Sequence, residues 1–244
     1  MQFLAFQLYA PLASYGAPAV GEARPSESHI GRSALLGLIA AALGIRRDDD
    51  AAQDALRGHY RVAVAVYADG FLLRDYHTAQ VPNASDLKHR PHSTRADELA
   101  VPKPDLNTIL STRDYRQDSY SIALAWQRGD AAPYPLSALR DALRAPQFTL
   151  YVGRKACPLA LPLQPQVVDA ETLSGALAAT RFDPPPELYL PARPLRVAWE
   201  DDLPSGFEAA TIYSVPRKDE PLSRRKWQFA DRTEHVALLG KPSP

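Results

Sequence analysis

The sequence predicts an α+β fold: a ferredoxin-like sheet with a long β-hairpin arm inserted between its second and third strands, plus a smaller β-rich C-terminal unit. Apolar periodicities follow one another in the order strand, helix, strand, strand, helix, strand. A polar segment at about 76–118 interrupts this order between the second and third strands. Prolines then become frequent, and only short strand patterns remain. We therefore expect a first domain at 1–165 and a Pro-rich C-terminal unit at 166–244.

Each element of the first domain has its own signal. Leu4, Phe6 and Leu8 alternate along the first predicted strand. The clearest helix has good helix formers throughout and ends before Gly44, a residue that suits a left-handed C-terminal position. The predicted strands lie at 2–9, 62–66, 120–126 and 148–152, and the predicted helices at 33–43, 49–58 and 136–144. In the C-terminal unit, strand patterns lie at 195–199, at 210–215 and in part of 227–239.

The overall charge restricts the function classes. Lys plus Arg and Asp plus Glu number 28 each in 244 residues, so affinity for a polyanion must come from local clusters. This balance disfavours a free-standing, high-affinity nucleic-acid binder and fits a subunit of a larger assembly. A single cysteine, Cys157, excludes an internal disulfide and agrees with a reducing cytoplasm. The most apolar stretch, 34–45, is too short to span a bilayer, so we expect a cytoplasmic protein without membrane contact.

The polar arm combines cations with aromatic rings. Arg74, Tyr76 and His77 lie at its first edge, and Arg113 lies at its last. Between them the arm carries further cationic or titratable side chains, namely Lys88, Arg90 and His92. Single-stranded nucleic acid is bound in this way, with rings stacking on bases and arginines holding phosphates. We therefore expect the arm to grip RNA.

Two further segments are candidates for contacts with phosphate. Tyr151, Gly153, Arg154 and Lys155 place a ring, a permissive glycine and two cations in succession, although a turn with solvated charges would give the same pattern. Arg32 precedes the first turn of the clearest helix, where unsatisfied N–H groups can receive a phosphate; a surface arginine near a helix end is the simpler alternative. The densest basic cluster, 217–226, is best interpreted as a solvated hairpin tip.

Catalytic chemistry receives little support from the sequence. No metal-ligand set and no phosphate-cradling glycine loop is present, so we expect no metal and no cofactor. Tyr76, His77, Lys88 and His89 have the residue types for metal-independent RNA cleavage, but a histidine beside a tyrosine is more often a structural hydrogen-bonding group. His92 begins one His-Ser-Thr motif, and nothing supplies the second that a paired acid and base would need.

Several motifs in order resemble the CasD family, the subunit of the type I-E CRISPR Cascade complex that holds the 5′ handle of the guide RNA (crRNA). The resemblance covers roughly residues 1–160. The matching segments are Ser14-Tyr15-Gly16 with Arg24-Pro25, the helix at 31–45, Arg74-Asp75-Tyr76-His77-Thr78, Thr108-Ile109 with Arg113 and Tyr115, and Gly153-Arg154-Lys155-Ala156-Cys157-Pro158. The arm is more proline- and histidine-rich than the family pattern, and the last eighty or so residues carry little that matches.

The resemblance implies an RRM-type sheet whose arm is a thumb lying over the guide RNA, with Arg113 at the position of the thumb arginine. It implies that Tyr151 to Lys155 help to grip the handle, and Tyr15 and Arg24 complete the expected RNA-binding set. The implied partners are the crRNA 5′ handle, CasC-type backbone subunits, a CasA-type large subunit and, indirectly, target DNA near the crRNA 5′ end. The implied role is non-catalytic and antiviral; a metal-independent endoribonuclease that processes precursor crRNA, as in subtype C systems, is the alternative.

Overall fold

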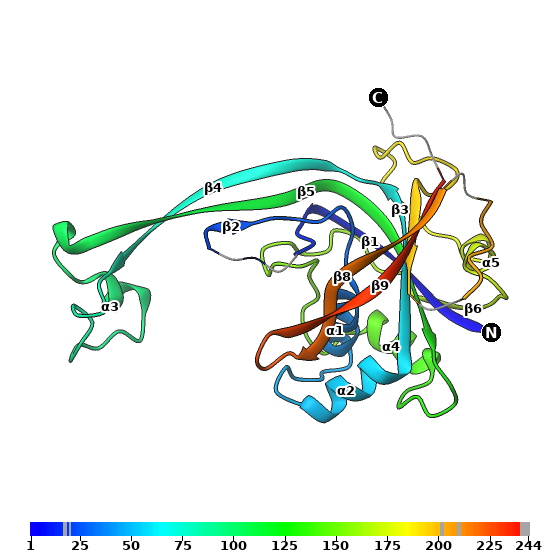
Figure 1. Ribbon diagram of the computed structural model, residues 1–244, viewed down its shortest axis with the longest axis horizontal. Coiled ribbons are helices and arrows are strands. Elements are labelled where there is room, and N and C mark those ends of the chain that lie inside the picture. The colour runs from blue at the N-terminus through cyan, green and yellow to red at the C-terminus, as the bar shows by residue number, and fades with distance from the viewer. Residues whose placement is uncertain (17–18, 20, 201–202, 209–210, 240–244) are drawn as a thin grey trace.

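The computed structural model describes residues 1–16, 19, 21–200, 203–208 and 211–239. Within these residues, nine strands join in one sheet of mostly antiparallel pairs (Figure 1). The strands are β1 (Gln2–Ala13), β2 (Ala23–Arg24), β3 (Tyr60–Ala68), β4 (Phe71–Pro82), β5 (Leu106–Gln127), β6 (Gln166–Asp169), β7 (Arg196–Trp199), β8 (Thr211–Ser223) and β9 (Gln228–Leu238). The helices are α1 (Arg32–Ala42), α2 (Asp50–His59), α3 (Arg95–Leu99), α4 (Leu136–Arg144) and α5 (Leu173–Ala178), with a 3₁₀ turn at Lys103–Asp105. The fold is therefore α+β, as predicted.

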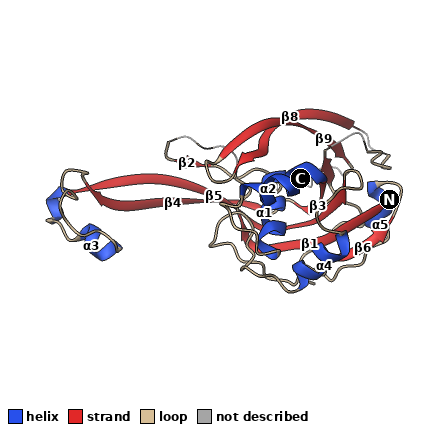
Figure 2. Ribbon diagram, turned by 90° about the horizontal axis from the view of Figure 1, so that it is seen from below, coloured by secondary structure: helices blue, strands red, loops and turns tan. Residues whose placement is uncertain are grey.

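The strands follow the order β6-β1-β5-β3-β7-β9-β8, and β2 and β4 pair with β5 outside this path. Every pairing is antiparallel except that of β2 with β5. The strand β5, which has 22 residues, belongs both to the body sheet and to the projecting hairpin. One part of β5 lies between β1 and β3, and the other part leaves the body and pairs with β4. We call β4, β5 up to Asp118 and the segment 83–105 between them the arm, which projects from one side of the body (Figure 2).

Both faces of the body sheet are buried, because alternate residues of the central strands pack into two separate cores. Ala123 and Ala125 pack into a core that contains residues of α1 and α4. Tyr120 and Trp126, on the opposite face, pack with residues of α5 and of β7. An open sheet face on which bases could stack is therefore absent from the described part of the body, which leaves the arm and the loops to contact ligands.

Two helix boundaries follow from the local chemistry expected of them. Gly44, just beyond α1, has φ +76°, so the left-handed residue predicted at the end of this helix is confirmed. Asp49 caps α2, because its carboxylate accepts a hydrogen bond from the backbone N–H of Ala52. The helix predicted at 136–144 is confirmed with the same bounds.

The fourth strand predicted at 148–152 is wrong. Tyr151 forms only an isolated bridge with Pro158. The backbone N–H groups of Gln147 and Phe148 instead donate to the carbonyl groups of Ala42 and Ala41 at the end of α1, so this segment cannot pair with a strand there. The strand beside β1 is β6, further along the chain. The mostly apolar run at 148–152 was predicted as a strand because its length and composition fit one. In the structure, backbone hydrogen bonds instead join its start to the end of α1, which is far away in the sequence.

The C-terminal residues continue the same sheet. β7 pairs with β3 and with β9, so backbone hydrogen bonds join the segment 166–244, which we expected to form a smaller unit, to the first domain. The strand predicted at 195–199 corresponds to β7. Of the strand predicted at 210–215, residue 210 lies outside the described residues and the rest belongs to β8. No described helix has the length and apolar character needed to cross a membrane.

Candidate nucleic-acid interface

Three segments meet where the arm leaves the body. β2 runs parallel to β5 and places Arg24 beside Arg113 in the register. The loop 151–158 lies against both segments through contacts described below. The side chain of Arg113 is half-buried and forms no hydrogen bond or ion pair with any residue that the structure describes. Its positive charge is thus available to an anion at the base of the arm.

Arg154 holds these three segments together. Its Nη1 donates to the carbonyl oxygen of Asp114 at 2.9 Å, and its Nη2 donates to the carbonyl oxygen of Arg24 at 3.0 Å. Its guanidinium lies 4.5 Å from the centre of the Tyr115 ring. Arg154, which we predicted to bind RNA, thus lies at the base of the arm, and Tyr115 is a neighbour that we had not included among the site residues.

Gly153 brings this loop close to the first strand. It has φ +91°, and a Cβ atom at this position would lie 1.7 Å from the carbonyl oxygen of Ser14. The backbone N–H of Ser14 donates to the carbonyl oxygen of Val152 at 3.0 Å. Only glycine permits this approach. Tyr151 and Lys155, on either side, are exposed.

The residues at the first edge of the arm lie on opposite faces of the hairpin. Arg74 forms a bidentate pair with Asp114, with N···O distances of 2.8 and 3.1 Å, and this hydrogen bonding lowers the pKa of Asp114. Tyr76 shares that face and is exposed, whereas His77 alternates to the face of Arg113. The charge of Arg74 is thus compensated, while that of Arg113 is not.

The remaining arm candidates lie in the segment beyond β4, far from the base (Figure 1). Lys88 and His92 are exposed. The Nδ1 of His92 donates to the carbonyl oxygen of Arg90 at 2.9 Å, and Arg90 itself donates to the carbonyl group of Ala100. The structure therefore does not bring these three residues together with the base of the arm; they form a separate polar end.

Two predicted site residues are buried and serve the protein interior. Arg32 is 2% exposed, and its guanidinium bonds Glu200 and Glu220, the latter with an Nε···Oε2 distance of 2.6 Å. The hydroxyl of Tyr15 shares a 2.7 Å hydrogen bond with Ser119, and burial raises the pKa of Tyr15 to about 12. The interpretation of Arg32 as a phosphate-binding residue at a helix start is corrected, because the carboxylates of buried Glu200 and half-buried Glu220 already bind its guanidinium.

We call Arg24, Arg113, Tyr151, Arg154 and Lys155 the arm-base surface. It contains four cations and one exposed ring, with Tyr115 beneath Arg154. In chemical terms it suits a single-stranded polyanion with planar bases. No group of three or more His, Cys, Asp or Glu side chains that could hold a metal ion occurs among the described residues.

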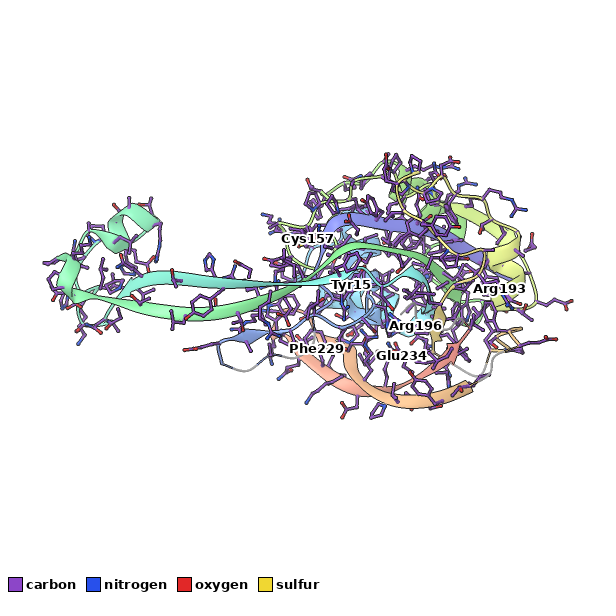
Figure 3. The ribbon with its side chains drawn as sticks, turned by 90° about the horizontal axis from the view of Figure 1, so that it is seen from above. Tyr15, Cys157, Arg193, Arg196, Phe229 and Glu234 are labelled. Atoms are coloured by element: carbon purple, nitrogen blue, oxygen red, sulfur yellow. The ribbon has the colours of Figure 1, made fainter. Side chains whose placement is uncertain are left out.

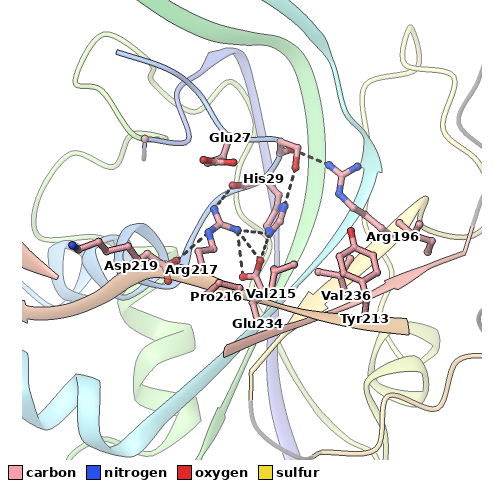
Figure 4. A pocket seen from close by; sticks show the side chains of 14 residues that line it. Glu27, His29, Arg196, Tyr213, Val215, Pro216, Arg217, Asp219, Glu234 and Val236 are labelled. Carbon is pink, nitrogen blue, oxygen red and sulfur yellow. Dashed lines mark hydrogen bonds and ion pairs between the residues drawn. The ribbon is translucent and has the colours of Figure 1, made fainter. Parts of the chain in front are cut away.

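Apart from the arm-base surface, a hollow of about 400 Å³ lies between the segment after β2 and the hairpin formed by β8 and β9 (Figure 4). Its floor contains a buried ion network in which Glu234 accepts hydrogen bonds from His29 at 3.0 Å and from Arg217 at 3.0 Å. Burial alone would raise the pKa of Glu234, but its cationic and hydrogen-bonding neighbours hold this pKa far below its usual range. Burial lowers the pKa of His29, whose Nε2 contacts both the Glu234 carboxylate and the guanidinium of Arg217. This network joins two distant parts of the chain.

Comparison with known proteins agrees with this arrangement. A family model described as "CRISPR-associated protein (Cas_Cas5)" matches residues 3–234. The CRISPR system Cascade subunit CasD of Escherichia coli (strain K12) is 35% identical over 162 residues, which cover 66% of this chain and 69% of that protein. A chain of a structure titled "CRISPR RNA-guided surveillance complex" covers all of this chain with a TM-score of 0.65 and 23% identity, and 92% of that chain is covered. A chain of a structure titled "Crystal structure of Cas protein" matches with a TM-score of 0.58 and 23% identity. The match covers 98% of this chain and 95% of that chain.

The chain has a body sheet, a projecting hairpin arm and a cationic arm base. The family model matches nearly all of it, so the chain is a CRISPR-associated protein. Within that class, the chain belongs to the CasD/Cas5 family.

Proposed function

We propose that this chain is the non-catalytic subunit of a type I-E CRISPR effector complex (Cascade) that grips the 5′ handle of the crRNA with the arm-base surface. The observation that carries the proposal is the uncompensated Arg113 beside Arg24, at the point where the arm leaves the body. Phosphates of the handle bind Arg113 and Lys155, and an unstacked base packs on Tyr151. The arm lies over the RNA as a thumb, and the body is a modified ferredoxin-like (RRM-type) sheet.

The proposed partners follow from the family and from the balanced charge. A chain with equal numbers of acidic and basic residues gains affinity from protein contacts as well as from RNA. We propose that the chain caps a filament of CasC-type backbone subunits and contacts a CasA-type large subunit. Target DNA then lies near the crRNA 5′ end and is reached only indirectly, because guide pairing reads its sequence.

The geometry of the arm supports a non-catalytic role. Tyr76 and His77 are adjacent in β4 and therefore point to opposite faces, so they do not converge on one phosphodiester. His77 has Asp75 as a neighbour, with 3.9 Å between Nδ1 and Oδ2. The alternative, metal-independent cleavage of precursor crRNA, requires a specific cut of repeat RNA by the purified chain that is lost in Tyr76→Phe or His77→Ala.

The proposal is tested with Arg113→Ala in the full-length chain. We expect affinity for single-stranded RNA derived from the cognate repeat to fall by about tenfold or more, as for loss of a charge-assisted contact. The slope of log affinity against log salt should become shallower by about 0.7, the value for one phosphate on a single strand. The melting temperature should hardly change, since the side chain has no bond to a described protein group.

Arg193→Ala is the matched control, because this exposed arginine lies at the end of the body away from the arm (Figure 3). It should leave RNA affinity and melting temperature unchanged. If Arg113→Ala instead lowers the melting temperature strongly while RNA binding is intact, Arg113 is a structural residue and the proposal is wrong.

A further inference from the structure

The tip of the hairpin formed by β8 and β9 carries an unusual set of side chains. Ser223 pairs with Gln228, and the four residues between them are Arg224, Arg225, Lys226 and Trp227. Arg225 and Lys226 are exposed, and neither side chain forms a hydrogen bond or ion pair with a described residue. Trp227 is 56% exposed. Tryptophan and arginine are the residue types enriched at contact sites, so the tip has the composition of one.

The backbone of Trp227 adds an independent observation. Its φ is +51°, in the left-handed region that glycine or asparagine adopts with less strain. A bulky aromatic residue at such a position costs free energy, and this kind of strain concentrates at functional sites. The turn would therefore form more easily with another residue. The indole ring itself is the feature that explains a tryptophan at this position.

Contacts with the body fix the tip in place. Arg224 donates to the carbonyl group of Ser33 in α1, and a Cβ atom at Gly37 would lie 3.0 Å from its Nη1. The guanidinium of Arg47, after α1, lies 4.9 Å from the centre of the Trp227 ring. Trp227 also has Phe229 as a neighbour, with 6.0 Å between the ring centres. The indole is thus held in a defined position, with more than half of the residue still reachable.

The tip lies on the side of the body from which the arm projects. Figure 3 shows Phe229, next to the tip, and Cys157, in the loop of the arm-base surface, both at that side, whereas Arg193 lies at the opposite end. In Figure 1 the closed end of the hairpin formed by β8 and β9 also points to the side of the arm. The arm base and the tip therefore lie at the same side of the body.

We propose that this hairpin tip is a second contact for single-stranded RNA, in which a base stacks on Trp227 and the adjoining phosphates bind Arg225 and Lys226. The inference rests on the proposed function, because it extends the RNA path beyond the arm-base surface. Stacking on an aromatic ring beside free cations is how single strands are held without reading their sequence. Asp48, whose pKa is lowered by its backbone hydrogen bond, by Arg46 and in part by the charge of Arg225, is bonded to Arg46 at 3.3 Å and forms no ion pair with either tip cation.

Three tip variants of the full-length chain test the inference. Trp227→Ala should weaken binding of repeat-derived single-stranded RNA by roughly 5- to 150-fold, the range for loss of one stacked base. Trp227→Phe should retain most of the affinity, because it keeps a stacking ring. The double variant Arg225→Ser with Lys226→Ser should make the salt slope shallower by about 1.4, which is 0.7 for each of two phosphates.

The variant Trp227→Gly distinguishes the role of the indole in RNA binding from its effect on the stability of the fold. Glycine relieves the positive φ, so the melting temperature should hold or rise while RNA affinity falls as in Trp227→Ala. Tyr189→Ala removes a fully exposed aromatic residue that is not at the tip, and it should change neither quantity. Ultraviolet crosslinking should join RNA to Trp227 in the wild-type chain.

The outcomes distinguish this inference from the proposed function. If the wild-type chain binds RNA and Arg113→Ala weakens binding, but the tip variants bind like wild type, the tip inference is overturned and the proposed function stands. If the tip variants bind RNA normally and lose only assembly with other subunits, the tip contacts protein and the inference is overturned. If the wild-type chain binds no repeat-derived RNA, both proposals fall.

Discussion

Single residues decide whether the segments at the arm base can meet, and Gly153 is the clearest case. Its positive φ and its contact with the backbone of Ser14 exclude every side chain. Arg154 follows at once, so the glycine also determines where this guanidinium lies. A loop that carries cations for a ligand is thereby placed by a residue that has no side chain.

Gly153→Ala should lower the free energy of unfolding by more than the 1–3 kcal/mol typical of a strained positive φ, because the methyl group also collides with the Ser14 carbonyl. Gly129→Ala is the matched control: Gly129 has φ +72°, and nothing lies within 4 Å of its Cβ position. Urea denaturation of both variants gives the comparison. Equal losses would show that the loop moves aside and that the close approach contributes nothing.

Arg32 is a residue whose role could not be predicted from the sequence. The arginine next to a helix start looked like a phosphate site because only its neighbours in sequence could be considered. The carboxylates that occupy Arg32 belong to Glu200 and Glu220, which are 168 and 188 residues away. Such pairings are set by the tertiary fold and leave no local signal. Arg113, in contrast, was predicted from its neighbours and is half-buried in the arm base, where the proposed function places an RNA contact.

At the scale of elements, long periodic segments were predictable, whereas short apolar segments were predicted with mixed success: the strand at 195–199 corresponds to β7, and the one at 148–152 does not exist. The helix predicted at 33–43 corresponds to α1, because an amphipathic pattern of this length has few alternatives. The strand predicted at 148–152 has a composition that fits a strand, yet the N–H of Phe148 bonds the end of α1 and the N–H of Val152 bonds the carbonyl group of Cys157. A stretch of five residues, four of them apolar or aromatic, does not contain the information that decides between these outcomes. The missing information is which acceptors the fold brings near.

We expect the segment 83–105 at the end of the arm to contribute little to the stability of the body. No residue of α3 or of the 3₁₀ turn at its end is buried, and α3 is held by its own capping box between Thr94 and Asp97. We expect that replacing 83–105 with Asn-Gly leaves the unfolding free energy within about 0.5 kcal/mol of wild type, as for other exposed changes. β4 and β5 already face each other at Pro82 and Leu106, so a tight turn can close them.

The same deletion should remove crosslinks between RNA and the segment that carries Lys88, Arg90 and His92, and leave those at the arm-base surface. Thermal melting and crosslink mapping check the two parts separately. A cooperative loss of structure on deletion would contradict the view that the arm folds as an appendage.

At the scale of the whole molecule, the two ends of the chain are joined by charge as well as by the sheet. His29 and Glu234 are 205 residues apart and bond each other in the buried network. Arg217 and Glu234 of this network lie in β8 and β9, the last two strands in the sheet order. The C-terminal hairpin and the segment after β2 therefore stabilise each other.

The network predicts a stability that falls in acid. The folded pKa of His29 is lowered below its ordinary 6.5, so the unfolded chain binds more protons as the pH falls below about 6.5, and stability decreases. The folded pKa of Glu234 lies below its ordinary 4.5, so its contribution is present above about pH 4.5 and is lost on further acidification. Urea midpoints measured from pH 7.5 down to about 3 should fall in these two stages.

His29→Gln should flatten the first stage and leave the second in place, because glutamine has no titrating proton and can still donate to Glu234. A wild-type midpoint that is constant between pH 7.5 and 5.5 would show that His29 does not carry the first stage.

One unbroken strand, β5, belongs to both the body and the arm. At the junction Asp118 has φ +56°, and Gly70 packs so closely that a Cβ atom would lie 2.2 Å from the carbonyl oxygen of Gln117. There is thus no loose linker at which the arm could swing freely. A load applied to the far end of the arm, by a ligand or by a neighbouring subunit, therefore passes along covalent backbone into the middle of the sheet.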